Sequence, residues 1–302
     1  MGRLLLVDGH AYAYRAFYAI RNMRSPAGQA TNAIFGFVKT LAKLRMAVPS
    51  SHVAVVWDGG LDADRQRELP EYKAQRPEMP ADLGSQIDDL IAYLQAEGVT
   101  SVCGDGVEAD DLIATLTRSA RAADLAVVIA SADKDFMQLV TDGVGLVNPN
   151  DKSEQIWGAA QVVGKSGVQP GQIVDYLSLL GDAVDNIPGV PGVGAKTAAL
   201  LLQKFGSVDG IYARLSETGS ERLRGALAGA GAAVRRNQEL VRLKAELGSA
   251  PAIESLVVGS PQREKLCGLF ARWGFRSLLA QAEAARAAEC GTGGTASQPG
   301  LL

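Results

Sequence analysis

Three carboxylates, Glu108, Asp110 and Asp111, lie within the stretch GDGVEADD at residues 104–111. A strand-like segment precedes them and the apolar run 112–116 follows, so we expect them where a strand leads into a helix N-terminus. A helix N-terminus favours a nearby carboxylate by about 0.3–1 kcal/mol, and one acid can serve as its cap. Capping does not account for a third carboxylate. The stretch therefore indicates a cation site, with an acidic, solvated helix start as the alternative.

Other acids follow apolar runs in the same way. Runs of strand length at residues 4–7, 53–57 and 126–130 lead to further carboxylates, namely Asp8, Asp58, Asp133 and Asp135. Such runs are typical of buried parallel strands, and open α/β sheets place their ligands at the carboxyl ends of the strands. The sequence therefore predicts an α/β fold with a mainly parallel central sheet flanked by helices, and one acidic site at its edge.

A second motif, GDAVDNIPGVPGVG at residues 181–194, separates predicted helices at 173–180 and 195–204. Asp182 and Asp185 are three residues apart, which can direct both carboxylates to one side of a turn. The glycines allow close backbone approach, and a helix start suits a phosphate. The spacing is not that of a Walker A loop. The geometry suits contact with a nucleic-acid backbone, but the glycines and prolines alone favour a purely structural turn between helices.

Residues 62–80 form a polar, proline-interrupted segment that carries Arg65, Tyr72, Lys73 and Arg76. Because the segment has little apolar face, we expect a mobile basic element, either a solvated loop or a clamp over an anionic ligand. Its position directly after an acid-tipped strand favours the clamp. Arg15, on a predicted helix at 11–21, either contacts a phosphate or lies along the surface.

Composition limits the classes of function. The chain has 302 residues, of which 47% are hydrophobic, so it is large enough for two domains. It has no apolar run long enough to span a membrane and no signal-peptide pattern. Its 3 cysteines are not spaced as in disulfide-bonded or metal-binding proteins, so we expect a reducing, cytoplasmic setting. With 2 histidines, a zinc site or a serine or cysteine triad is disfavoured. The net charge of −3 includes the metal-site candidates, so a nucleic-acid partner remains compatible.

Five short segments together resemble the acidic motifs of the 5'-nuclease superfamily. They are LVDG, VWDG, EADD, ADKD and GDxxDNIPG. The superfamily contains the 5'-3' exonuclease domain of bacterial DNA polymerase I, the phage 5' nucleases and the flap endonucleases. The resemblance runs from residue 4 to about residue 279. It implies a PIN-like nuclease domain at 1–165 with a helical arch at 62–80, and a helical DNA-binding domain at 166–286 with a helix-three-turn-helix at 173–204. We expect the Gly- and Ser-rich tail, 287–302, to be disordered.

The resemblance also implies roles for individual residues. Two Mg²⁺ or Mn²⁺ ions would be held by an inner group of Asp8, Asp58, Glu108, Asp110, Asp133 and Asp135, and partly through water by Asp111, Asp182 and Asp185. Lys73 and Arg76 would contact the scissile phosphate and Tyr72 would stack on the substrate. DNA contacts are expected from Arg15, Arg65, Gly189, Gly192, Gly194, Lys196 and Thr197, with a K⁺ ion on backbone carbonyls of the helix-three-turn-helix.

Two positions depart from the family pattern, with Asp64 where Phe is usual and Val107 where Tyr is common. The implied function is a monomeric 5'-3' exonuclease and 5'-flap endonuclease for DNA and RNA primers in replication and repair. A non-catalytic DNA-binding module and a phosphohydrolase for small phosphates are the alternatives. The first is disfavoured because all nine acids are present, and the second because it would need neither the glycine-rich hairpin nor the basic arch.

Overall fold

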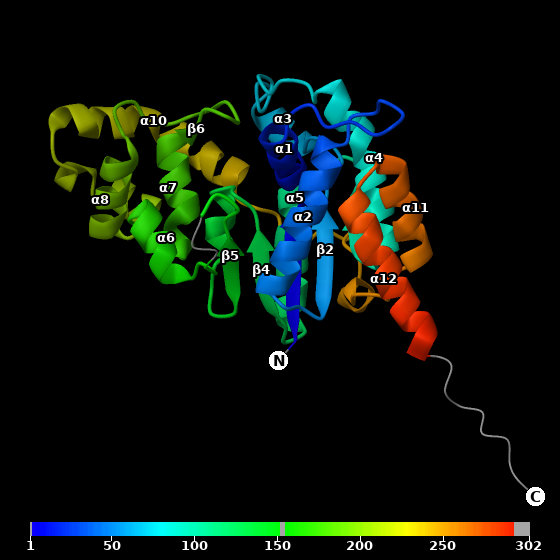
Figure 1. Cartoon of the computed structure of the whole chain (residues 1–302). Coiled ribbons are helices and arrows are strands. Elements are labelled where there is room, and N and C mark those ends of the chain that lie inside the picture. Colours follow the sequence, from blue (N-terminus) through cyan, green and yellow to red (C-terminus); the bar gives the residue numbers. More distant parts are fainter. Residues whose placement is uncertain (1, 152–154, 293–302) are drawn as a thin grey trace, which may run out of the picture.

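A five-stranded, all-parallel sheet forms the centre of the computed structural model, which describes residues 2–151 and 155–292 (Figure 1). Its spatial order is β3-β2-β1-β4-β5. The strands are β1 (Arg3–Asp8), β2 (His52–Val56), β3 (Thr100–Val102), β4 (Ala126–Ala130) and β5 (Val144–Val147). The predicted α/β class with a parallel sheet is confirmed.

Both faces of the sheet are buried, because successive residues of its apolar strands point to opposite sides. In β1, Leu4 and Leu6 join one hydrophobic core, whereas Leu5 and Val7 join the other. The second core is covered by α1 (Gly9–Ala19), α2 (Asn32–Ala47), α4 (Ala81–Ala96), α11 (Arg263–Trp273) and α12 (Arg276–Thr292). The first is covered by α5 (Ala109–Ala122) and by the helices that follow β5.

Those helices lie beside β5 and extend away from the sheet, on the left of Figure 1. They are α6 (Ala159–Ser166), α7 (Ile173–Leu180), α8 (Ala195–Phe205), α9 (Val208–Ala213) and α10 (Glu221–Val241). Between α7 and α8, β6 (Gly181–Asp182) and β7 (Ile187–Pro188) form a short antiparallel pair. Another short helix, α3 (Ala63–Glu68), lies between β2 and α4, and 3₁₀ turns occupy η1 (Asp135–Leu139), η2 (Pro170–Gln172), η3 (Leu215–Glu217) and η4 (Ile253–Leu256).

The C-terminal helices differ from expectation in two ways. Instead of joining the helical part, α11 and α12 return to the sheet, where Phe270, Trp273 and Leu278 pack in the same core as β1. Moreover, α12 continues to Thr292, so residues 287–292 are helical rather than part of the expected disordered tail. The remainder of that tail, 293–302, lies outside the described residues.

Candidate metal centre

Four acids converge at the carboxyl edge of the sheet, where they line one pocket of about 330 Å³. They are Asp8 at the end of β1, Asp58 just beyond β2, Asp133 beyond β4, and Asp110 in the first turn of α5. Each is supplied by a different part of the chain, so the convergence is produced by the parallel strands. The structure thus brings together the acids that the sequence places after these strands and at the start of this helix.

Asp8 and Asp58 are also bound to helix starts. The Asp8 carboxylate accepts hydrogen bonds from the Ala11 amide (3.0 Å) and from Ser131 Oγ (2.8 Å). The Asp58 carboxylate accepts one from the Ala109 amide at the start of α5 (2.8 Å). Two of the pocket acids are therefore positioned by α1 and α5, while Asp110 and Asp133 approach them from α5 and the β4–η1 loop.

The ionised forms of two of these acids, Asp8 and Asp110, are disfavoured by their surroundings. Burial is the largest cause that raises the pKa of Asp8, to about 6, and the charges of Asp58 and Asp133 add to it. Burial also raises the pKa of Asp110 well above its ordinary value, followed by the charges of Asp133 and Asp8. A bound cation would relieve both desolvation and repulsion.

Asp135, Asp182 and Asp185 form a second group beside the pocket. Burial and then the charge of Asp133 raise the pKa of Asp135 to about 8. Its Oδ1 atom is buried and has no hydrogen-bond partner among the described residues. Asp182 accepts from Lys134 Nζ (2.5 Å) and Asp185 from Arg76 Nη2 (2.6 Å).

The donor set fits a hard divalent cation, because it consists of carboxylate oxygens and includes an unpartnered one. In the described residues, no three His, Cys, Asp or Glu side chains are grouped closely enough to hold one ion as they stand. Ligation would therefore require the acids to draw together around the cation.

We predict that Asp135→Asn raises the thermal stability of the metal-free protein, and does so more at pH 8 than at pH 4. The pKa of Asp135 rises on folding from 3.8 to about 8, so the folded chain binds more protons and stability falls as pH rises through this window. Asn removes that loss. Thermal unfolding in EDTA at both pH values measures the effect, with the exposed Asp142→Asn as control. An equal effect at both pH values would contradict the prediction.

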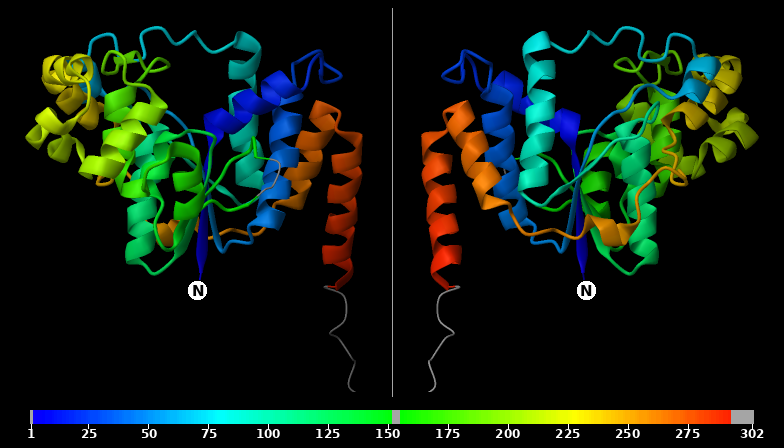
Figure 2. Two further views of the ribbon diagram at one scale, coloured as in Figure 1. Left: turned by 90° about the vertical axis from the view of Figure 1, so that its left-hand side faces the viewer. Right: turned by 90° about the vertical axis from the view of Figure 1, so that its right-hand side faces the viewer.

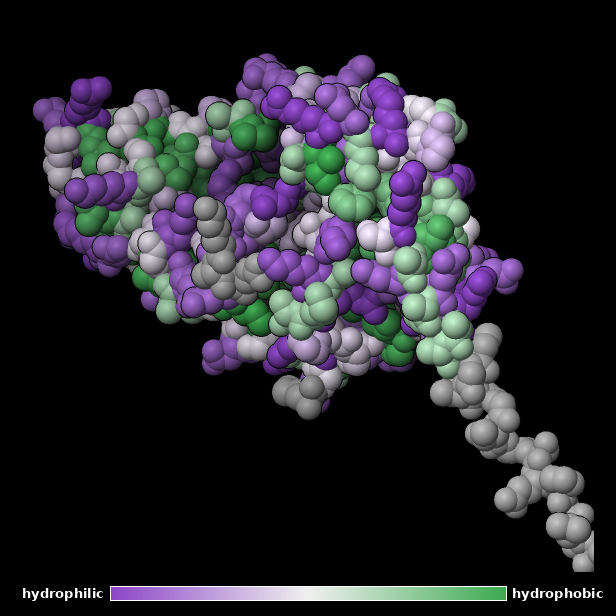
Figure 3. Space-filling model, in the orientation of Figure 1, coloured by the Kyte–Doolittle hydropathy of each residue, from purple (hydrophilic) through white to green (hydrophobic). Residues whose placement is uncertain are grey.

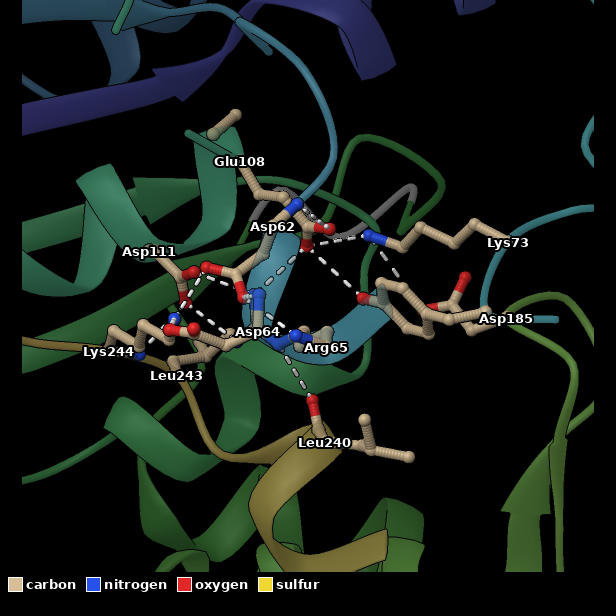
Figure 4. A network of polar contacts seen from close by, with 12 residues as sticks. Asp62, Asp64, Arg65, Lys73, Glu108, Asp111, Asp185, Leu240, Leu243 and Lys244 are labelled. Carbon is tan, nitrogen blue, oxygen red and sulfur yellow. Dashed lines mark hydrogen bonds and ion pairs between the residues drawn. The ribbon is translucent and has the colours of Figure 1, made fainter. Parts of the chain in front are cut away.

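Glu108 and Asp111 are not among the residues that line the pocket. Figure 4 shows both carboxylates directed at Arg65, a side chain that is only 4% exposed. Asp111 accepts from Arg65 Nη1 (2.6 Å) and Nη2 (2.8 Å), and from the Lys244 amide (2.8 Å). The expected metal role of Asp111 is corrected accordingly, since both of its oxygens are occupied by protein donors.

Glu108 is the meeting point of three basic-segment side chains. Its Oε2 accepts from Lys73 Nζ (2.7 Å), Arg65 Nη1 (3.1 Å) and Tyr72 Oη (3.1 Å). Its Oε1 accepts a long hydrogen bond from the Asp62 amide (3.4 Å). A metal ion would therefore meet Glu108 either at Oε1 or by displacing one of the three donors from Oε2. Glu108 thus does not line the pocket itself but is joined to it through Lys73.

The basic segment is anchored rather than a solvated loop, which corrects the expected mobile element. Leu69 and Tyr72 are buried in the first core, and Lys73 has a left-handed backbone (φ 56°) whose amide donates to the Asp185 carbonyl (3.1 Å). The part of the segment between α3 and α4 crosses above the upper edge of the sheet in both views of Figure 2. Because Arg65 and Tyr72 are buried, the expected DNA contact and base stacking are corrected too. Lys73 and Arg76 do line the acidic pocket.

The glycine-rich hairpin contains two sterically required glycines, Gly181 and Gly189, and two exposed ones. A Cβ at Gly189 would lie 2.0 Å from the Leu180 carbonyl oxygen, so Gly189 is needed for packing rather than for ligand contact. Gly192, Gly194 and Lys196 are exposed and Thr197 is half-buried. The N-terminus of α8 has no side-chain cap, which leaves its first amides available to an anion.

Arg15 lies elsewhere. It is exposed and donates to Asn150, and it does not line the acidic pocket. In Figure 3, hydrophilic residues gather over the upper part of the face shown and in the depression between the sheet and the α7–α8 side. The exposed hairpin residues Gly192, Gly194 and Lys196 do not line the acidic pocket.

The sequence analysis missed two polar residues that contact the pocket acids, one of which also lines the pocket. His10 lines it and accepts a hydrogen bond from the Asp58 amide at Nδ1 (3.1 Å). Ser131 donates to Asp8 and accepts from the Asp133 amide. Each lies two residues from a predicted acid in the sequence, and this proximity is the one feature that could have identified it as part of the site.

Comparisons with known proteins agree with this geometry. A family profile described as 5'-3' exonuclease, N-terminal resolvase-like domain, matches residues 3–167, and one described as 5'-3' exonuclease, C-terminal SAM fold, matches 168–264. DNA polymerase I of Pseudomonas aeruginosa is 42% identical over 91% of this chain but only 31% of its own length. The chain therefore spans about a third of that relative.

Two further proteins match nearly end to end. A protein named 5'-3' exonuclease from Aquifex aeolicus is 34% identical, over 94% of this chain and 96% of its own. The structure of the flap endonuclease of bacteriophage T5, in a pseudo-enzyme-product complex with DNA and metal ions, aligns with a TM-score of 0.66 and 23% identity. That alignment covers 93% of this chain and 99% of the other, and it shows a shared fold.

Proposed function

The chain belongs to the 5'-3' exonuclease family, and on this premise we propose that it hydrolyses phosphodiester bonds at the 5' ends and 5' flaps of DNA. One observation carries the proposal. Four strand-end and helix-start acids share a pocket with Lys73 and Arg76, so cation-binding and phosphate-binding groups face the same space. This combination suits cleavage of a polyanion better than binding alone.

We assign the metal ions to the two acidic groups. Asp8, Asp58, Asp110 and Asp133 would hold one divalent ion, Mg²⁺ or Mn²⁺, and Asp135, Asp182 and Asp185 the second, partly through water. Two such ions activate water and stabilise the charge that develops on the phosphate. Within the pocket, Lys73 and Arg76 would orient the phosphate and neutralise part of its charge.

The duplex would be held by the hairpin between α7 and α8. Its exposed glycines, the uncapped α8 N-terminus and Lys196 offer backbone amides and a positive charge to DNA phosphates. Such contacts do not distinguish one base from another, so we expect the protein to recognise DNA structure rather than sequence.

We further propose a K⁺ ion at this hairpin, activity on RNA primers, a monomeric state and a cytoplasmic setting. Of the described residues, none belongs to a helix long and apolar enough to cross a membrane.

The substrate assignment is tested with three 5'-labelled DNAs: a flap duplex, the same duplex without a flap, and the single strand. With Mg²⁺ we expect the flap to be cut near its junction and the blunt duplex to be shortened from its 5' end, while internal cuts in the single strand are slower. Equal cutting of all three would contradict structure specificity. Cutting of small phosphate esters alone would favour a different phosphohydrolase.

A further inference from the structure

Arg65 joins three elements through one guanidinium group. From α3 it donates to Asp111 and Glu108 at the start of α5, and also to the carbonyls of Leu240 (Nε, 3.0 Å) and Arg242 (Nη2, 2.9 Å) at the end of α10. Every nitrogen of the guanidinium is thus occupied, and the side chain is almost completely buried. Figure 4 shows Arg65 between Glu108, Asp111 and Leu240.

This arrangement reaches the acidic pocket through Glu108. The Oε2 atom that accepts from Arg65 also accepts from Lys73 Nζ, and Lys73 lines the pocket beside Asp58 and Asp110. Lys73 has a second, looser ion pair with Asp185 (4.0 Å). The ion pair with Glu108 is the shorter of the two. Arg65 binds the same Glu108 carboxylate, so the position of Arg65 affects this ion pair.

We propose that Arg65 is a positioning residue for the nuclease reaction, acting through Glu108 on Lys73, with Asp111 as its anchor. The proposal rests on the proposed function. We call Arg65, Glu108 and Asp111 the Arg65 cluster. By also binding the end of α10, the cluster connects the position of Lys73 with the helical part that carries the hairpin.

A purely stabilising role makes a different prediction. A buried ion pair can often be replaced by apolar side chains of similar size without loss of stability, whereas removal of one partner is costly. Lysine cannot reproduce the two-pronged guanidinium contact, although it keeps the charge. Stability and positioning can therefore be separated by comparing a single variant with a paired apolar variant.

The test uses Arg65→Met, Arg65→Met combined with Asp111→Leu, and Arg65→Lys, with Arg118→Met as the control. Arg118 also links α5 to the segment after α10, through an exposed pair with Glu246, but does not touch Glu108. We expect the double variant to recover most of the metal-free thermal stability that Arg65→Met loses. Its kcat on the flap duplex should nevertheless fall by about 10–100-fold, with flap binding in EDTA little changed.

A second readout needs neither metal nor cleavage. Lys73 is buried and ion-paired, so its acetylation by an amine reagent, followed by mass spectrometry, should be slow in the wild type. We expect several-fold faster acetylation in the double variant and in Arg65→Lys, and wild-type rates in Arg118→Met. If the double variant does not fold, Arg65→Lys decides.

Two outcomes would overturn the inference. They are wild-type kcat in a folded cluster variant, and Lys73 acetylation that stays at the wild-type rate. A wild-type protein that cuts no DNA would instead overturn the proposed function, and the acetylation rates would still test whether Arg65 positions Lys73.

Discussion

Asp133→Asn is expected to lower kcat on a 5'-flap duplex by about a thousandfold or more while changing flap affinity by about threefold at most. Asp133 lines the pocket, and its charge acts on Asp8, Asp110 and Asp135. Asn keeps the size of the side chain and can still accept the hydrogen bond that the Asp135 amide donates (2.9 Å), so the loop should keep its shape. What is lost is one negative charge at the proposed metal site.

Single-turnover cleavage with Mg²⁺ and flap binding in EDTA measure the two effects of Asp133→Asn separately. The exposed Asp142→Asn, in the loop before β5, is the control for loss of a surface charge. Parallel loss of cleavage and binding would place Asp133 in DNA binding and count against its role as a metal ligand.

Lys73→Met is expected to lower kcat by about 10²–10³-fold with little change in flap affinity. Lys73 is buried and lines the acidic pocket, where its ammonium group would meet the phosphate beside the metal ions. Met keeps the length and apolar character of the stem but carries no charge. The left-handed backbone at position 73, and the hydrogen bond that its amide donates to the Asp185 carbonyl, do not involve the side chain and should remain in the variant.

The control for Lys73→Met is Lys265→Met, since Lys265 is exposed on α11, away from the acidic pocket. Rates are compared with flap duplex in excess and with enzyme in excess. A variant that loses affinity but keeps its single-turnover rate would make Lys73 a DNA-binding residue rather than a catalytic one.

The parallel sheet and the acids at its edge could be predicted because they depend on local pattern. Apolar runs of strand length predict buried parallel strands, and parallel strands bring their carboxyl ends to one edge. Asp8, Asp58 and Asp133 then had to lie near one another. Asp110 shares that location because the helix it begins follows a strand of the same sheet.

The basic segment could not be predicted in this way, because its burial depends on partners far along the chain. Arg65 looks solvated in sequence, yet it is ion-paired with Asp111 and Glu108 and donates to the carbonyls of residues 240 and 242. The same pairing explains why Asp111 was taken for a metal ligand. Several acids in a short stretch indicate that positive charge lies nearby, but they do not show whether metal ions or arginine side chains supply it.

The return of α11 and α12 to the sheet is a similar case. The apolar faces of these helices predict that they pack against another part of the protein, but the sequence pattern does not identify that part. In the structure Trp273, Phe270 and Leu278 complete the core over β1 and α4, which leaves the helical part between β5 and α10 to carry the hairpin.

The central claim is that the acids at the sheet edge act through divalent metal ions, and it is tested most directly by single-turnover cleavage of the flap duplex by protein stripped with EDTA. We expect no cleavage in EDTA, recovery on titration with Mg²⁺ or Mn²⁺, and no recovery with Asp133→Asn at the same metal concentration. Cleavage that persists in EDTA, or that returns equally in wild type and variant, would contradict the assignment of these carboxylates to a catalytic metal centre.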